Sequence, residues 1–199
     1  AAAMTRRGPE YGFHLEEHRK GTFVVEVDTD LADFAEWGAM AKLGGESHQS
    51  YFAVPVFTGI RRASTADELK HLGASLASYG SMAMYHMVGV TPEAPTLEAA
   101  LGGNQPTDRM RISRADIERV FVSYKNPDGS CNFVVFSGPQ LSLFEIKRLA
   151  ELFDGRRVHA GTTVFVTTSN SLLSAARALG YAQKLEAAGT QFVIEPQIR

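Results

Sequence analysis

The amino-acid sequence predicts an α/β protein of two layered α/β/α lobes with mostly parallel sheets, and three observations support it. Short segments rich in β-branched and aromatic residues alternate along the chain with segments whose apolar residues recur at helical spacing. The strand-like segments are apolar, as in parallel sheets covered on both faces. A polar stretch with glycine and proline separates two alternating blocks, so we expect a first lobe at 1–101, a linker at 102–112 and a second lobe at 113–199.

Three strands are predicted in the first lobe, at 22–28, 52–57 and 82–85. Pro55 lies inside the second run and indicates an edge position or a bulge, because proline has no N–H to donate to a neighbouring strand. A short helical turn is expected at 98–101.

Two helices connect these strands. Asp30 is expected to cap the first helix, which continues to about Leu43 and ends at Gly44–Gly45. Ser64 is expected to cap the second helix, which Gly80 ends. The first lobe therefore reads β-α-β-α-β.

The second lobe is predicted to read α-β-α-β-α-β. Its helices are expected to begin at Ser113, at a capping box formed by Ser142 and Glu145, and near Asn170. Its strands are expected at 132–136, 164–168 and 191–195, and a turn is expected at 126–130.

The composition is that of a globular protein, with 44% hydrophobic and 21% charged residues. A net charge of −2 and scattered basic pairs argue against a nucleic-acid partner. No apolar run approaches the roughly 20 residues of a membrane span, so a cytoplasmic protein without a membrane partner is expected. The single cysteine, Cys131, excludes an intramolecular disulfide and any site held by several cysteines of this sequence. Met4 follows three alanines, which suggests a piece of a longer chain.

Polar residues follow the run 82–85, where His86, Thr91 and Glu93 lie among two prolines and a glycine. Ligands of α/β proteins bind just outside the carboxyl ends of strands. An imidazole, a hydroxyl and a carboxylate at such an end predict part of a polar site, with an ordinary surface loop as the alternative.

The segment before the first strand, EYGFHLEEHR, concentrates further site chemistry. Arg19 is suited to clamp a carboxylate or phosphate, and His14 to transfer a proton. The alternative is an amphipathic surface segment. His14 and His18 have a spacing that can bind zinc, but the sequence offers no convincing third ligand, so we reject a zinc site.

Two strand ends of the second lobe precede helix N-termini, which are natural anion sites. Ser142 caps a helix and is a candidate for an additional ligand contact, and Thr168 and Ser169 repeat that geometry. Capping alone is the alternative for all three.

Taken together, these segments resemble the large-subunit or catalytic region of the aconitase X family. The match covers nearly the whole chain in family order, and the block HMVGVTPEAPT is its most specific part. The motifs are YGFHLEEHR (Tyr11–Arg19), VPVFTGI (Val54–Ile60), residues 68–96, GPQLS (138–142), RVHAG (157–161), FVTTS (165–169) and residues 180–189.

The resemblance implies a hydro-lyase that dehydrates a small hydroxy acid such as cis-3-hydroxy-L-proline or mevalonate 5-phosphate. It also implies an aconitase-like fold, an iron–sulfur cluster and a smaller swivelling domain, which is supplied in the same chain or as a second subunit. Carried onto matching motifs, it makes His86, Glu93 and His14 the catalytic candidates. The candidate substrate contacts are Arg19, Thr91, Ser142, Thr168 and Ser169.

The sequence departs from the family where a Cys-Pro-His tripeptide is common, because it has Gly138-Pro139-Gln140 there. Cys131 does not match that position, so the cysteine ligands of the expected cluster are not present in this chain. The resemblance also leads us to expect that the chain starts after the family's N-terminal active-site segment and stops before the later cluster region and the swivelling domain. The alternative function is therefore a non-catalytic, cluster-less module, a degenerate relative or fragment that binds a metabolite or a partner subunit.

Overall fold

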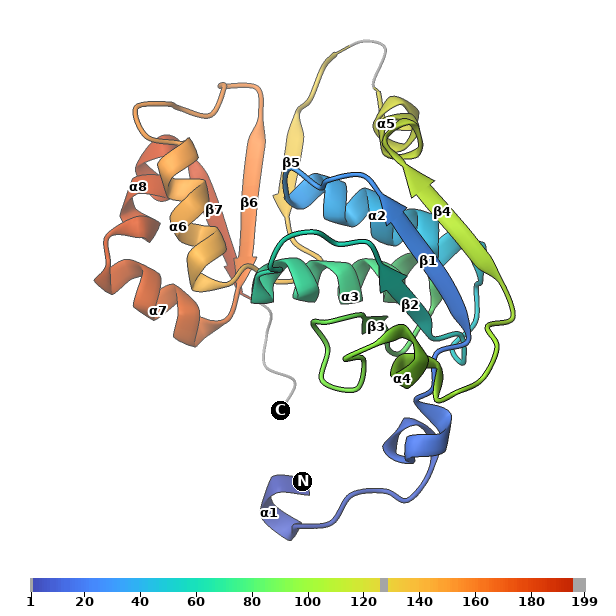
Figure 1. The fold of residues 1–199 in the computed structure, drawn as a ribbon. Helices are drawn as coiled ribbons and strands as arrows, with labels where there is room; N and C mark the ends of the chain where they lie inside the picture. The colour runs from blue at the N-terminus through green and yellow to red at the C-terminus, as the bar shows by residue number, and fades with distance from the viewer. Residues whose placement is uncertain (1, 126–128, 195–199) are drawn as a thin grey trace. The chain divides into compact units, whose positions relative to one another are not determined.

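The computed structural model describes residues 2–125 and 129–194 and confirms the α/β class (Figure 1). The chain divides into two compact units, unit 1 over 1–124 and unit 2 over 125–199. The division lies later than the expected linker at 102–112. Part of that segment is strand, and its glycine- and proline-rich portion is a loop inside unit 1. The composition of this segment correctly predicted a loop, but the loop is not the boundary between the two units.

Unit 1 contains a sheet whose described strands are all parallel, in the order β3-β2-β1-β4. The register aligns Val24 of β1 with Val56 of β2 and His86 of β3. The strands are β1 (Phe23–Asp28), β2 (Pro55–Thr58), β3 (His86–Met87) and β4 (Arg109–Ser113).

Helices cover the two faces of this sheet unequally. The strands β1, β2 and β3 advance in one direction across the sheet, so right-handed connections place α2 and α3 on the same face. The connection from β3 to β4 runs back across the sheet and places α4 on the other face. The helices are α1 (Ala2–Thr5), α2 (Phe34–Ser47), α3 (Ala66–Gly80), α4 (Leu97–Leu101) and α5 (Arg114–Ser123).

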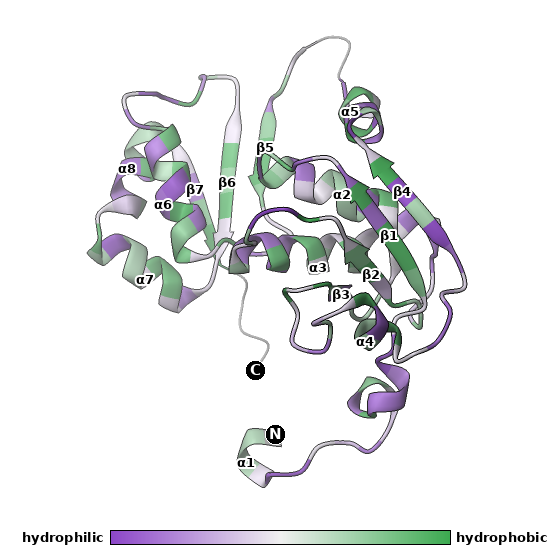
Figure 2. Cartoon of the chain, viewed as in Figure 1, coloured by the Kyte–Doolittle hydropathy of each residue, from purple (hydrophilic) through white to green (hydrophobic). Residues whose placement is uncertain are grey.

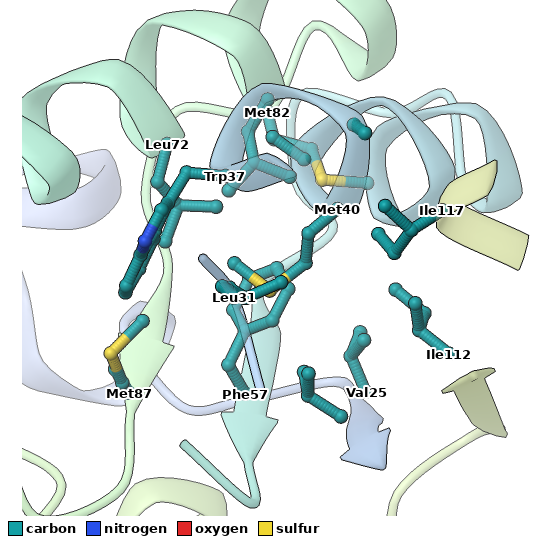
Figure 3. Packing of buried hydrophobic residues seen from close by; sticks show 14 of the residues in the cluster. Val25, Leu31, Trp37, Met40, Phe57, Leu72, Met82, Met87, Ile112 and Ile117 are labelled. Atoms are coloured by element: carbon teal, nitrogen blue, oxygen red, sulfur yellow. The ribbon is translucent and has the colours of Figure 1, made fainter. Parts of the chain in front are cut away.

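The core of unit 1 confirms this arrangement. Trp37 of α2, Leu72 of α3 and Ile117 of α5 belong to one buried cluster with residues of the sheet (Figure 3). A smaller cluster on the opposite face joins Val24 and Val56 to residues of α4 and the loop before it. The α4 face is covered only over the first half of the strands, because Glu26 and Asp28 further along β1 are exposed.

Unit 2 contains a parallel sheet in the order β5-β6-β7, with its described helices on one face. Unit 2 therefore has two layers, one of strands and one of helices, where the sequence predicted three. Phe133, Val135 and Val193 alternate with the less exposed positions of β5 and β7 and are 52%, 45% and 39% exposed. Figure 2 shows the hydrophobic colouring of β5 and of the middle of β6. The elements are β5 (Phe133–Phe136), α6 (Leu143–Leu152), β6 (Thr163–Thr168), α7 (Asn170–Ala178), α8 (Tyr181–Ala188) and β7 (Thr190–Ile194).

Two predictions about the strands of unit 1 are wrong, and one strand was not predicted. The run 82–85 is not a strand, and β3 begins at His86, since the N–H of Met82 donates instead to Leu76 O of α3 at 3.5 Å. Pro55 opens β2, which lies inside the sheet, and the first residue of a strand tolerates the missing N–H. The strand that was not predicted is β4, whose arginines alternate with Met110 and Ile112.

Helix boundaries differ by a few residues from those expected. Asp33, not Asp30, caps α2, and Thr65, not Ser64, caps α3. The helix start at Ser113 and the capping box of α6 are confirmed. The predicted turn at 126–130 and strand at 191–195 lie partly outside the described residues. Among the residues that the structure does describe, no helix is long and apolar enough to cross a membrane.

Gly44–Gly45 does not end the first helix, because α2 continues to Ser47 and buries both glycines. A Cβ atom on Gly80 of α3 would lie 2.6 Å from the carbonyl oxygen of Gly45. The two helices therefore touch through their backbones, and glycine is required for packing rather than for termination.

We expect Gly80→Ala to lower the free energy of unfolding by about 1–3 kcal/mol, because the added methyl group forces α2 and α3 apart. Gly44→Ala is the matched control, since its Cβ would lie at an ordinary 3.4 Å from Phe57 Cζ and alanine favours a helix by up to about 1 kcal/mol. Urea unfolding of both variants measures the difference. Equal stability of the two would contradict the proposed backbone contact.

A second prediction concerns Glu68, which is 6% exposed and accepts hydrogen bonds from Arg62 Nη1 and Nη2 at 3.0 and 2.5 Å. Burial disfavours its carboxylate, but the hydrogen bonds from Arg62 and Thr65 outweigh burial and lower the pKa of Glu68. A lowered folded pKa contributes stability above the unfolded pKa, and this stability is lost as the pH falls through the folded pKa. Glu68→Gln should therefore destabilise the protein at neutral pH and much less in acid, as measured by urea unfolding at pH about 7 and about 3.

Candidate functional site

The structure brings the segment Tyr11–Arg19 against the block that follows β3. The Arg19 Nε donates to the Glu93 carboxylate at 2.9 Å, although the two residues lie 74 positions apart. Arg19 Nη1 donates to the carbonyl oxygens of His14 and Phe13 at 3.1 and 3.4 Å. Among the described residues Nη2 has no hydrogen-bond partner, so one N–H edge of the guanidinium remains available to a ligand.

His86 holds the same segment from the sheet. Its side chain faces the α4 side of β3 and is 3% exposed. Its Nε2 lies 2.5 Å from the carbonyl oxygen of Arg19. A carbonyl oxygen only accepts, so Nε2 carries the hydrogen and donates.

These residues border a cavity of about 350 Å³. Its charged residues are the cations Arg19 and Lys20 and the carboxylates Glu16 and Glu93. Lys20 and Glu16 were not predicted as site residues, although Glu16 lies in the segment EYGFHLEEHR and Lys20 directly follows it. The lining residues are Glu16, Arg19, Lys20, His86, Pro92, Glu93, Pro95, Ala99, Ala100 and Gly102.

Lys20 and Glu16 carry the charges that remain unpaired, because neither side chain forms an ion pair within the described residues. The stem of Lys20 lies over Gly102 at the end of α4, where a Cβ would lie 2.7 Å from Lys20 Cδ. Gly102 has a φ of +59° and leaves the room that this stem needs.

The cavity lies beside the amino end of β1, not at the carboxyl ends of strands as predicted. Gly21, two residues before β1, donates through its N–H to Ala100 O at 2.8 Å. The chain after β3 turns back at Gly89, whose φ is +76° and whose N–H donates to Ala94 O at 2.8 Å. This turn returns Glu93 to the side from which Arg19 approaches.

Arg114 occupies part of the carboxyl end of the sheet. The strand order places the reversal of connections, where α/β sheets commonly bind ligands, between β1 and β4. Arg114 lies there and donates to Thr29 Oγ1 at 3.0 Å and to Glu36 Oε1 at 2.5 Å. Burial raises the pKa of Glu36, but the hydrogen bonds from Arg114 and Ala32 outweigh burial, and the pKa of Glu36 is lowered. The guanidinium of Arg114 is therefore engaged in bonds that stabilise the fold.

Two predicted site residues of unit 1 have structural contacts. Thr91 Oγ1 accepts from Met87 N at 2.9 Å and donates to Met87 O at 3.2 Å, which closes the turn after β3. The imidazole of His14 is exposed, packs edge-on against Tyr11 and does not line the cavity. Only the backbone of His14 reaches Arg19.

Ser142, Thr168 and Ser169 belong to unit 2, where the structure shows them at helix starts and at the end of β6. Ser142 and Ser169 accept from the backbone N–H groups of Glu145 and Leu172 and cap α6 and α7. Thr168 is fully buried and donates to Leu141 O at 2.8 Å, so its only O–H is used within the unit. The capping alternative is confirmed for the two serines, and their ligand contacts stay a prediction.

The described residues do not provide ligands for an iron–sulfur cluster. Cys131 is exposed and its thiol contacts the carbonyl of Phe133 at 3.4 Å. Within 2–125 and 129–194 no group of three histidine, cysteine or acidic side chains is arranged to hold a metal ion.

Comparison with protein families agrees with these features. Residues 21–122 match the family model "Aconitase X second domain", and residues 131–195 match "Aconitase X third domain". The junction between the two matches includes the division between unit 1 and unit 2.

Relatives of known function match almost the whole chain. It is 36% identical to the phosphomevalonate dehydratase large subunit of Methanothermobacter thermautotrophicus, over 97% of this chain and 46% of that protein. It is 33% identical to the cis-3-hydroxy-L-proline dehydratase of Pseudomonas aeruginosa, over 97% of this chain and 33% of that protein. The crystal structure of Thermococcus kodakaraensis aconitase X in its holo-form superposes with a TM-score of 0.83 and 28% identity, over 98% of this chain and 48% of that one. The chain thus spans a third to a half of the length of these relatives.

We expect Glu93→Gln to lower the free energy of unfolding by less than about 1 kcal/mol, because Glu93 and Arg19 form a partly exposed ion pair. The double-mutant cycle with Arg19→Met should show similarly weak coupling in urea unfolding. A coupling of several kcal/mol would mean that the pair exists to stabilise the fold rather than to hold charges beside the cavity.

Proposed function

The chain belongs to the aconitase X family, and on that premise we propose that it forms part of a dehydratase that eliminates water from a small hydroxylated carboxylate. Cis-3-hydroxy-L-proline is the first candidate substrate. The relatives named for phosphomevalonate and for cis-3-hydroxy-L-proline are 36% and 33% identical to the chain, so overall identity does not choose between them.

The charge balance of the cavity supports an amino acid over a phosphorylated acid. Two cations and two carboxylates line it, and Lys20 and Glu16 are unpaired there among the described residues. A ligand with both an ammonium and a carboxylate group finds a partner for each. A ligand that carries a phosphate and a carboxylate would bring its negative charges beside Glu16 and Glu93, at an electrostatic cost.

The residues of the cavity suit the chemistry of such an elimination. A proton leaves the carbon next to the carboxylate, the bond to the neighbouring hydroxyl breaks, and a double bond forms as water departs. Lys20 and the free Nη2 of Arg19 would hold the carboxylate and stabilise the negative charge that develops as the proton leaves. Glu16 and Glu93 are the cavity carboxylates available to accept that proton.

The departure of the hydroxyl group is assigned to polypeptide outside the described residues. No step is assigned to a cluster held by this chain, since its described residues do not fit one. Relatives named as large subunits suggest a smaller partner subunit. The lack of a ligand set among these residues also favours a second candidate function, a non-catalytic module that binds the same class of metabolite.

The deciding experiment compares substrates on the natural gene product that contains this chain, purified without oxygen together with any subunit that co-purifies. We expect kcat/KM for cis-3-hydroxy-L-proline to exceed that for mevalonate 5-phosphate by at least about 100-fold, because a site with unpaired polar groups rejects a ligand that cannot pair them. Turnover of the phosphorylated acid alone would contradict the proposed substrate class. Binding of hydroxyproline without turnover would favour the non-catalytic module.

A charge-removing variant tests the proposed contact. Lys20→Met should raise KM for the hydroxy acid by about tenfold or more, the loss expected for one hydrogen bond to a charged group. Lys147→Met, at an exposed position of α6, is the matched control and should leave KM unchanged. If both variants behave alike, Lys20 does not contact the substrate.

A further inference from the structure

We propose that His86 is a positioning residue that fixes the backbone of Arg19 and Lys20 beside the cavity, rather than a base that transfers a proton. The proposal rests on the proposed function of this cavity. This role differs from the catalytic one expected from the sequence, because the structure shows that the imidazole is bonded to the Arg19 carbonyl oxygen.

The tautomer of His86 is determined by its partner. Nε2 donates to the Arg19 carbonyl at 2.5 Å, so that nitrogen cannot accept a proton while the bond exists. Protonation of the ring would have to occur at Nδ1, on a side chain that is 3% exposed.

The position of His86 in the sheet explains why its imidazole requires a hydrogen-bond partner. Its neighbours in the register are Val56 and, one strand further, Val24, both fully buried under the α4 side. A polar residue beside this apolar cluster requires a partner. The partner that the structure provides is the backbone of the segment that carries the site.

Arg19 is thereby held at both ends. Its carbonyl is bound by His86, and its guanidinium is bound by Glu93 and by the backbone of Phe13 and His14. Gly21, two residues on, is bound to Ala100 at the end of α4. Loss of the His86 bond would release the stretch between these anchors, and both cavity cations lie on it.

Two amides of different length separate positioning from proton transfer, because neither can titrate. In His86→Gln the side-chain amide reaches about as far as Nε2 and keeps the N–H donor, whereas in His86→Asn it reaches only as far as Nδ1. We expect His86→Asn and His86→Ala to lower kcat/KM for the hydroxy acid by about tenfold or more, mainly through KM. His86→Gln should recover most of that loss and keep the wild-type pH profile. The charged residues that line the cavity together with His86 are Glu16, Arg19, Lys20 and Glu93.

The second readout is hydrogen–deuterium exchange of the segment 11–21 in the substrate-free protein, with the melting temperature as the check on folding. We expect faster exchange in His86→Asn and near wild-type exchange in His86→Gln. This result is independent of the substrate, so it stands even where neither candidate substrate is turned over and the proposed function fails. A His86→Gln variant that keeps the segment protected but is as inactive as His86→Asn would overturn the proposal and identify His86 as a proton-transfer residue.

Discussion

The connection from β3 to β4 is the constraint on which the site of unit 1 depends. It runs back across the sheet, and a right-handed crossover in that direction can only pass over the face that α2 and α3 leave open. Because α4 has five residues, it covers the amino half of the strands and no more. The segment before β1 therefore meets α4 and the loop after β3 at one end of the sheet, and the cavity lies where these three pieces join.

Local sequence signals predicted those parts of the fold whose cause is local. The strand β1, the start of α5 at Ser113 and the capping box of α6 depend on residues within a few positions of each other. The strand β4 escaped prediction because one of its faces is charged and exposed, so its arginines interrupt the apolar pattern. Gly44–Gly45 was misinterpreted because its reason, close contact with Gly80, lies in another helix and is invisible to local pattern.

The residues of the candidate site were easier to predict from the sequence than the place of the site in the fold. Arg19, His86 and Glu93 were singled out for their chemistry, and the structure brings all three to one cavity. The sequence could not show that the turn at Gly89 reverses the chain, so the site was expected at the wrong end of the strands. Thr168 shows the opposite error, since a hydroxyl that looks available in the sequence is fully buried and already donating.

The hydrogen bonds of Arg19 indicate how a ligand can enter without disturbing the segment. Its Nη1 is bound to backbone carbonyls and its own carbonyl to His86, and these bonds orient the guanidinium. The Glu93 carboxylate is its partner on the exposed side, with 47% of the side chain accessible. A carboxylate ligand can therefore approach the free Nη2 group while the backbone bonds persist. The ligand then competes only with Glu93 for Arg19, and this exposed ion pair is the least costly of the bonds to exchange. The arrangement keeps one cation oriented and leaves Lys20, a flexible point charge, to adapt to the ligand.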